Sequence, residues 1–424
     1  MPNPKHPFAF RDFRYFWTAR VCATLAQNAM VVVIGWQVYD IARRTMAPKE
    51  AALQLGIAGL VQFLPVFALT LLTGWVADRV DRRFISRLTL ALQLACAAML
   101  GWLSYTGAIT LPALFAVAAL LGVARAFNGP ALNALASNLV PPDVLPRAIA
   151  TNSIAGRVGG IGGPALGGYL YAWAPHMPYA ASAGLLALAL LCMLMIRPIT
   201  RTMMDGTRNP WRQMLEGLSY VRDNKLVLGA ISLDLFAVLL GGATALLPVF
   251  ARDILHVGPA GLGHLRAAPA IGAVATGLWF SWHPLRSRVG IKMLVSVAVF
   301  GLATVGFGLS RWWPLSIACL GLLGAADMFS VYVRQTLIQL YTPNAMRGRV
   351  GAVSSLFISA SNELGEAESG FFASLIGPLP AVVAGGIGAI GVTLLWARLF
   401  PELRRAKTFA PPAHLVQPAE ETRP

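Results

Sequence analysis

Gly74-Trp75-Val76-Ala77-Asp78-Arg79-Val80-Asp81-Arg82-Arg83 joins two long apolar runs of the chain, residues 53–76 and 86–105. Each run is long enough to cross a bilayer, because about 20 helical residues rise roughly 30 Å. The charged side chains between the runs must therefore lie at a membrane face. Arginines gather on the cytoplasmic side of membrane proteins. The stretch therefore predicts a tight helical hairpin whose turn faces the cytoplasm.

The composition extends this interpretation to the whole chain. Of its 424 residues, 56% are hydrophobic and only 12% are charged, whereas a soluble protein carries about 25% charged residues. The chain is therefore expected to be a polytopic membrane protein. Its net charge of +16 faces anionic lipid rather than nucleic acid, because the basic residues gather at one membrane face. The four cysteines lie inside apolar runs without metal-ligand spacing, which is typical of free packing thiols.

Twelve apolar runs predict an all-α protein with twelve transmembrane helices. A polar stretch, residues 197–225, divides them into an N-terminal half, residues 16–196, and a C-terminal half, residues 226–398. Residues 1–15 and 399–424 flank the two halves as cytoplasmic segments. The expected helices cover residues 16–39, 53–76, 86–105, 112–136, 148–172, 178–196, 226–250, 261–281, 291–309, 314–337, 350–374 and 379–398.

The distribution of lysine and arginine sets the orientation. Most of these residues fall on segments that lie inside if the N-terminus is cytoplasmic, so both termini are expected to be cytoplasmic. The first outer loop, with Arg43 and Arg44, is a local exception. The basic residues expected outside are Arg43, Arg44, Lys49, Arg252 and Arg311.

The two cytoplasmic segments after the first half differ in character. In the linker, Trp211, Leu215 and Leu218 recur at helical spacing, which predicts an amphipathic helix on the inner membrane face. The tail after Pro401 is polar and proline-rich, so it is expected to be disordered.

The two halves repeat in parallel. A shift of the first half along the chain brings Pro141 onto Pro343 and Arg147 onto Arg349, with the order of spans preserved. Halves related in this way place a substrate site between them, near the middle of the membrane.

These residues resemble the major facilitator superfamily. The opening stretch is similar to the signature between its second and third helices, with Asp81 where that signature usually has glycine. Residues 125–129, Arg-Ala-Phe-Asn-Gly, resemble its motif in the fourth helix, and residues 159–168 resemble the glycine–proline motif of its antiporters. Residues 362–370 are similar to a branch of bacterial exporters that includes the enterobactin exporter and macrolide efflux proteins.

The resemblance implies a role for the hairpin. It would be a latch that holds the two halves together on the cytoplasmic side when the protein faces outward. The alternative is that its arginines only fix the orientation of the chain, although orientation does not require the acid at Asp78. The gating residues would be Gly74, Asp78, Arg79, Arg82 and Arg83.

The glycines of the fifth span recur every four residues. Gly159, Gly163 and Gly167 therefore line one face of a helix, where small residues allow close packing. Pro164 removes a backbone donor and bends the span. The resemblance extends the motif to Gly168 and implies an antiporter role, whereas the residues themselves require only close packing.

Charged residues inside the spans are the sharpest signal for function, because each costs at least ~2.5 kcal/mol at bilayer depth. The N-terminal half holds only basic ones, Arg20, Arg125 and Arg157, and the C-terminal half holds every acid. Arg20, Arg266 and Arg334 lie near span ends, where snorkelling or anchoring is expected. The predicted proton-coupling residues are Asp234, Glu363 and Glu366, with Arg125 as their basic counterpart. Static pairing between helices is the alternative.

A second set of polar residues could contact substrate or neighbouring helices. These are Gln27, Asn28, Gln62, Asn152, Arg157, Asp327 and Asn362. No histidine has metal-ligand spacing with another ligand, and no phosphate-binding loop or nucleophile–base set is present. The sequence therefore predicts neither an enzyme nor a bound metal or cofactor.

Together these features predict a secondary transporter of the inner membrane. We expect proton-driven export of an amphipathic or aromatic small molecule, such as a drug, siderophore or metabolite, by a monomer in the lipid bilayer. Import, lysophospholipid flipping and a non-transporting sensor remain the alternatives.

Overall fold

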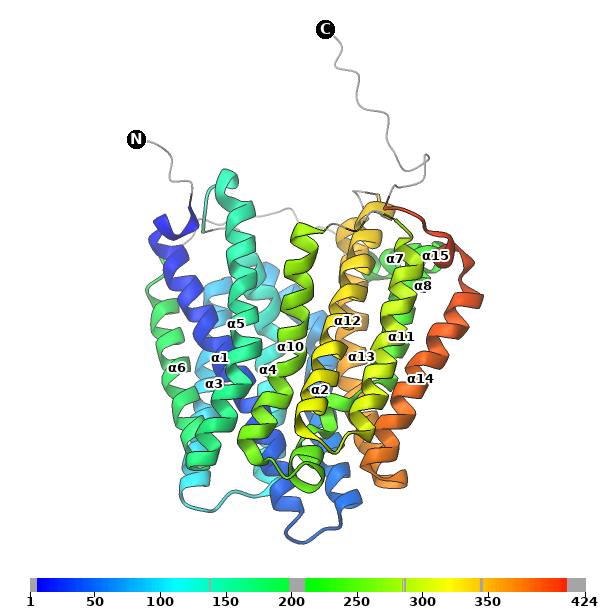
Figure 1. Cartoon of the computed structure of the whole chain (residues 1–424). Coiled ribbons are helices and arrows are strands. Elements are labelled where there is room, and N and C mark those ends of the chain that lie inside the picture. Colours follow the sequence, from blue (N-terminus) through cyan, green and yellow to red (C-terminus); the bar gives the residue numbers. More distant parts are fainter. Residues whose placement is uncertain are drawn as a thin grey trace.

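The computed structural model describes residues 6–136, 139–197, 210–283, 285, 287–343 and 346–409. Within these ranges, side chains are not described at positions 70–72, 74, 75, 77–79, 129–131, 133, 134, 136, 142, 210–213 and 363. The described chain is almost entirely helical, and its long helices run side by side as one bundle (Figure 1).

The helices follow the predicted apolar runs closely. They are α1 (Arg11–Ala42), α2 (Pro48–Arg79), α3 (Arg82–Tyr105), α4 (Leu111–Ala136), η2 (Pro142–Val144), α5 (Leu145–Trp173), α6 (Met177–Leu194), α7 (Pro210–Asp223), α8 (Lys225–Leu240), η3 (Ala243–Leu246), α9 (Leu247–Val249), η4 (Phe250–Ile254), α10 (Gly258–Trp282), α11 (Val289–Leu309), α12 (Trp313–Tyr341), α13 (Arg347–Ile376), α14 (Pro378–Leu399) and α15 (Pro401–Arg405).

Nine segments of the described chain are long and apolar enough to cross a membrane. The other long helices at predicted spans are α5, α10 and α13. Their glycines, prolines and charged residues lower their mean hydropathy. The total of twelve spans therefore stays a prediction, as does the orientation of the termini.

The seventh predicted span is not one helix. A continuous helix over residues 226–250 was expected, but α8 ends at Leu240 and the chain continues through η3 and α9 into the π-helix η4. Gly241 and Gly242 weaken the helix at the break, and Pro248 cannot donate a backbone hydrogen bond. The break bends the chain into the centre of the molecule.

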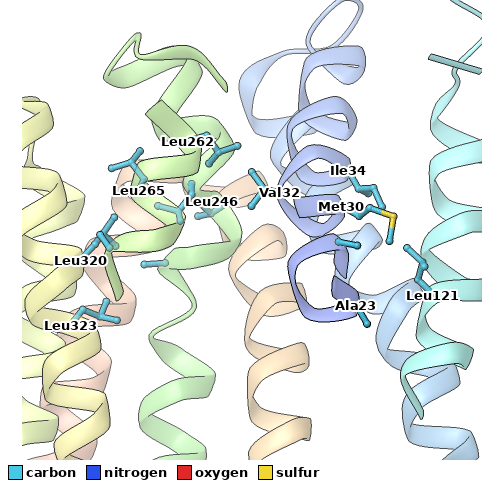
Figure 2. Packing of buried hydrophobic residues seen from close by; sticks show 14 of the residues in the cluster. Ala23, Met30, Val32, Ile34, Leu121, Leu246, Leu262, Leu265, Leu320 and Leu323 are labelled. Carbon is cyan, nitrogen blue, oxygen red and sulfur yellow. The ribbon is translucent and has the colours of Figure 1, made fainter. Parts of the chain in front are cut away.

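Two helix pairs join the N-terminal half to the C-terminal half. α2 packs along α13, and α5 packs along α10. Within the halves, α1 packs on α5 and α6, while α10 and α11 both pack on α12. In Figure 2, Val32 of α1 points toward Leu246 and Leu262 of the C-terminal half, whereas Met30 and Ile34 point toward Leu121 of α4. α1 therefore lies between its own half and the other one.

The linker helix α7 lies at the same end of the bundle as α15 (Figure 1). Glu216 of α7 pairs with Arg349 at 2.5 Å, and the Tyr220 hydroxyl donates to the Tyr341 carbonyl at 2.6 Å. Leu215 and Leu218 remain exposed on the outer side of α7. These contacts tie the helix to the end of α12 and the start of α13, and its exposed apolar face is the one expected to meet the membrane surface.

The tail differs from the expectation of disorder from residue 399 onward. Residues Pro401–Arg405 form α15, Leu403 is fully buried, and the Gly290 backbone N–H donates to the Ala406 carbonyl at 3.1 Å. The segment packs against α8, α11 and α14, and burial of Leu403 together with the hydrogen bond to Ala406 holds it in place. Residues 410–424 lie outside the described part of the chain.

Candidate functional site

A cavity of about 80 Å³ lies between the two halves. The N-terminal half contributes α1, α2 and α4 to its wall, and the C-terminal half contributes η3, α9, α10 and α13. The wall is largely apolar. It is formed by Val31, Val32, Ile34, Gly35, Leu55, Ala58, Gly59, Gln62, Ala118, Thr244, Ala245, Leu247, Pro248, Leu262, Arg266 and Glu366.

An ion pair stands in this apolar wall. Arg266 Nη2 lies 3.3 Å from Glu366 Oε1, and Arg266 Nη1 donates to the Thr244 carbonyl at 2.8 Å. The expectation that Arg266 snorkels at a span end is therefore wrong, and it is Arg266 that pairs with Glu366. The pair offers a ligand both a cationic donor and an anionic acceptor while the wall stays electrically neutral.

The predicted proton-coupling acid Asp234 is also paired. It forms an ion pair with Arg334, and the two residues are only 5% and 2% exposed. Arg334 therefore does not snorkel as expected, and it takes the place that Arg125 was predicted to hold beside Asp234. The position of Arg334 near the end of its span led to the wrong prediction, because a residue near a span end can still point into the bundle. The side chain of Glu363 lies outside the described residues.

Arg157 reaches from one half to the residue that follows Asp327 in the other half. Arg157 of α5 reaches Met328 of α12, with Nη2 3.6 Å from the thioether sulfur. The sequence assigned both residues to the substrate cavity, whereas neither is among the residues that line the cavity between the halves.

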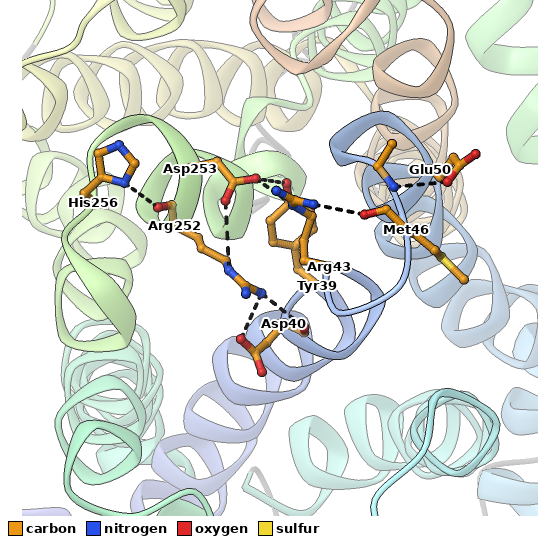
Figure 3. Close-up of polar contacts among 9 residues, drawn as sticks. Tyr39, Asp40, Arg43, Met46, Glu50, Arg252, Asp253 and His256 are labelled. Carbon is orange, nitrogen blue, oxygen red and sulfur yellow. Dashed lines mark hydrogen bonds and ion pairs between the residues drawn. The ribbon is translucent and has the colours of Figure 1, made fainter.

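A group of polar contacts between the halves lies at the end of the bundle where α1 finishes (Figure 3). Arg43 Nε lies 3.0 Å from Asp253 Oδ2, and the Tyr39 hydroxyl donates to the same oxygen at 2.6 Å. In the opposite direction, Arg252 Nη1 lies 2.8 Å from Asp40 Oδ1. Each half therefore supplies an acid and a base to a reciprocal network.

Two further contacts close the same end of the bundle. The Tyr169 hydroxyl of α5 lies 2.6 Å from His264 Nε2 of α10, and Lys49 Nζ of α2 donates to the Leu375 carbonyl of α13 at 3.0 Å. We call these contacts and the reciprocal network the outer gate, because the predicted orientation puts this end outside. The gate joins the halves at α1, at α2 and at α5.

Sequence reasoning missed the outer gate, although it held a signal. Arg43 and Arg252 were noted only as basic residues on the side where such residues are scarce. The hydrogen bond to Asp253 raises the pKa of Arg43 above its already high value, so this group stays charged. A basic residue that departs from the positive-inside distribution therefore deserved a search for an acidic partner in another loop.

The predicted cytoplasmic latch is described only in part. The side chains of Asp78 and Arg79, and the contacts of Gly74, lie outside the described part of the structure. Arg83 Nη2 lies 2.6 Å from Asp81 Oδ2, and its Nη1 donates to the carbonyl of Ile196 at 3.3 Å. Asp81 also accepts a hydrogen bond from the Arg83 backbone N–H as the N-cap of α3. Arg83 therefore ties α3 to the end of α6 within one half.

The glycine motif of α5 has two packing surfaces. A methyl group on Gly159, Gly163 or Gly167 would come within 2.5–2.8 Å of atoms of α1, so this face permits the closest approach between the two helices. A methyl group on Gly168 would lie 2.5 Å from the Pro259 carbonyl oxygen of α10, across the interface between halves. Pro164 lies inside α5 and is buried.

Of the predicted substrate residues, Gln62 lines the cavity. Gln27 instead donates to Gln93 Oε1 at 2.7 Å and joins α1 to α3. Asn28 donates to the carbonyl of Thr24 in its own helix at 2.8 Å. The polarity of a residue alone does not show whether its side chain hydrogen-bonds to a helix or faces a cavity. The structure places the remaining predicted residues away from the cavity wall: Asn152, Arg157, Asp327 and Asn362.

Comparison with known proteins identifies the family. Residues 3–421 match a family described as transmembrane secretion effectors. The enterobactin exporter of Citrobacter koseri is 26% identical over 398 residues, which cover 93% of this chain and 92% of the exporter. The enterobactin exporter of Escherichia coli O139:H28 is 26% identical over 404 residues, with 94% of both chains covered.

Two solved transporters share the fold. A bacterial homologue of the human lysosomal transporter Spinster, in an inward-facing and occupied conformation, superimposes with a TM-score of 0.72 at 15% identity, covering 92% of this chain and 97% of that one. A nucleoside transporter superimposes with a TM-score of 0.71 at 14% identity, covering 92% of this chain and 99% of the other.

Proposed function

The chain belongs to the transmembrane secretion effector family of the major facilitator superfamily, and from this membership we propose that it is a proton-driven exporter of siderophore-like molecules. It is a multi-pass transporter of the inner membrane. In the proposed cycle, a monomer exposes one central site to the cytoplasm and to the outside in turn.

The observation that carries the proposal is a cavity between the halves that lies directly beneath the outer gate. Val31 and Gly35 line the cavity, and the gate residues Tyr39 and Arg43 follow one and two turns later on α1 or just beyond its end. A ligand held there is separated from the outside by contacts that break only if the halves move apart. This is the arrangement that alternating access requires, with the outer side closed.

The wall chemistry favours an amphipathic substrate. Aliphatic side chains provide most of the surface, while Gln62, Thr244, Arg266 and Glu366 provide the polar groups. Such walls suit a molecule with aromatic or apolar faces and several hydrogen-bonding groups, and Arg266 suits an acidic group. The cavity of about 80 Å³ is smaller than the roughly 300–1,000 Å³ of drug-sized ligand sites. Substrate entry therefore requires the cavity to widen.

Acidic residues of the C-terminal half support the proton-driven part of the proposal. Asp234, Glu363 and Glu366 lie in spans where a charge is costly, and Glu366 borders the cavity directly. Protonation of Glu366 would weaken its attraction to Arg266, so Arg266 would then be free for an anionic substrate. Proton entry and substrate binding would compete for the same ion pair, which is the basis of antiport.

Secretion of a catecholate siderophore by an iron-starved bacterium that lacks its own siderophore exporter tests the proposal. Expression of this chain should restore secretion, and a protonophore should abolish it. Glu366→Gln should lower the rate about tenfold, because an unpaired Arg266 in an apolar wall costs at least about 1.4 kcal/mol. Glu402→Gln on α15 is the matched control and should leave the rate unchanged.

The result distinguishes the alternatives. Restored secretion that survives the protonophore would remove proton coupling from the proposal. If the siderophore concentration in the supernatant did not change although the protein is present in the membrane, a siderophore substrate would be rejected. Uptake and lipid substrates would then be tested. Equal effects of the two glutamine variants would show that the cavity ion pair has no part in transport.

A further inference from the structure

A second, smaller cavity lies inside the C-terminal half, between α8, α11 and α12. Its volume of about 10 Å³ is close to the minimum that one water molecule needs. Two carboxylates from different helices, Asp234 and Asp327, border the same small space. The full wall is Asp234, Ala237, Val238, Val297, Phe300, Ala326, Asp327 and Ser330.

The wall contains a polar group that lacks a partner. Ser330 is 2% exposed, and its hydroxyl makes no hydrogen bond within the described residues. Nε of the neighbouring Arg334 is buried and unpartnered in the same way. A buried hydroxyl without a partner costs about 1–3 kcal/mol, and a hydroxyl both donates and accepts. The cavity is therefore built for a small polar occupant.

The charges around the cavity are not equivalent. Asp234 is held by Arg334, whereas the described part of the chain offers Asp327 neither an ion pair nor a hydrogen bond. Arg157 of α5, in the other half, contacts Met328, which follows Asp327 in the chain. The α11 wall is uncharged, and α10, which also packs on α12, directs Arg266 to Glu366 instead.

We propose that this cavity is a proton-binding site in which Asp327 holds the proton and one water molecule links it to Ser330 and Asp234. Protonation of Asp234 would leave the charge of Arg334 uncompensated in the protein interior, which is strongly unfavourable. Protonation of Asp327 orphans no buried base. The proton changes the charge of the α12 segment that Arg157 contacts from the other half, at Met328. The coupling role of the site rests on the proposed antiport, whereas proton binding does not.

Infrared difference spectroscopy during a pH titration tests the site, because a protonated carboxyl group has its own C=O stretching band. The purified full-length chain in lipid nanodiscs should show a band from Asp327 that appears reversibly as the pH falls, besides any band from Glu366. Asp327→Asn should lose that band, Asp327→Glu should keep it at a shifted midpoint, and Ser330→Ala should shift its frequency. Glu366→Gln, in the other cavity, should keep it.

Several results would overturn the assignment. They are retention of the band in Asp327→Asn, its loss in Glu366→Gln, or its suppression when NaCl replaces choline chloride at constant pH, which would indicate a metal cation. Each variant is first shown to elute as a monodisperse peak, and Asp327→Glu preserves the test if Asp327→Asn does not fold. Because no substrate is present, failure of siderophore secretion and failure of this site are separate outcomes.

Discussion

Arg43 and Asp253 are each about a quarter exposed, so water screens the attraction between them. A single pair of this kind contributes only about 0.2–1 kcal/mol. The outer gate is stabilised by several such contacts together, because Tyr39 also donates to the Asp253 carboxylate and Arg252 pairs with Asp40. The gate is thus a set of weak contacts that close together and that a modest driving force can open.

Arg43→Gln should shift the chain toward the outward-open state by about fivefold, which corresponds to about 1 kcal/mol. The measurement is the rate at which a membrane-impermeant thiol reagent, added from outside, labels Val31→Cys in the cavity wall of a cysteine-free background. Arg44→Gln is the matched control, because the exposed Arg44 pairs with Asp40 inside one half. Equal labelling rates in the two variants would contradict a gating role for Arg43.

The buried pair of Arg334 and Asp234 behaves differently. Arg334→Met leaves a carboxylate unpaired inside the protein and should lower the free energy of unfolding by about 3–5 kcal/mol. The double variant Arg334→Met with Asp234→Leu should recover most of that loss, since both charges are gone. Thermal unfolding of the detergent-solubilised protein measures both effects. If the double variant were no more stable than Arg334→Met, the unpaired carboxylate would not be the cause of the lost stability.

At the scale of helices, the contact between α1 and α5 depends on the absence of side chains. A methyl group on Gly163 would lie 2.6 Å from the Asn28 Cβ atom, a distance at which something must move. A methyl group on Gly156 in the same helix would meet nothing within 4 Å. The two positions have the same helical backbone and differ only in what faces them.

This pair gives a controlled prediction. Gly163→Ala should destabilise the protein by about 1–3 kcal/mol through overpacking. Gly156→Ala should be neutral or slightly stabilising, because alanine favours a helix over glycine by about 0.5–1 kcal/mol. Melting temperatures of the two variants decide the matter. Similar melting temperatures would mean that α1 moves away from α5 at no cost.

At the scale of the whole molecule, the described polar contacts of the outer gate lie at one end of the interface between halves. Arg83, from the motif at the other end, makes its contacts within one half. In the predicted orientation, the contacts of the outer gate close the outer side, and we expect the latch at Asp78, whose side chain lies outside the described residues, to form in the opposite conformation. Two gates at opposite ends that exclude one another are what a two-state transporter requires.

Asp78→Asn should therefore insert normally but lose export, because the outward-facing state would lack its latch. We expect the thiol labelling of Val31→Cys from outside to fall as well, the reverse of the effect of Arg43→Gln. Asp143→Asn, an exposed acid in η2, is the control and should leave both readings unchanged. Normal export by Asp78→Asn, at a membrane level equal to the parent's on an immunoblot, would dismiss the latch.

The positions of the helices could be predicted from the sequence, because a span is specified by some 20 consecutive residues. The glycine face of α5 could be read for the same reason, since its spacing is a property of one helix. The prediction failed at residues 241–248, where α8 stops and the chain bends. Glycine and proline permit such a break, but the packing of the other helices decides whether it occurs.

The amino-acid sequence by itself determined that this chain is a bundle of membrane helices with costly charges in its second half. Only the tertiary structure decided which charges meet. Arg43 finds Asp253 at a distance of 210 positions along the chain, and the buried Arg334 finds Asp234 on another helix. Hydropathy is a local quantity summed along one helix, whereas an ion pair depends on the rotation and tilt of two helices. Those angles are set by the packing of the whole bundle.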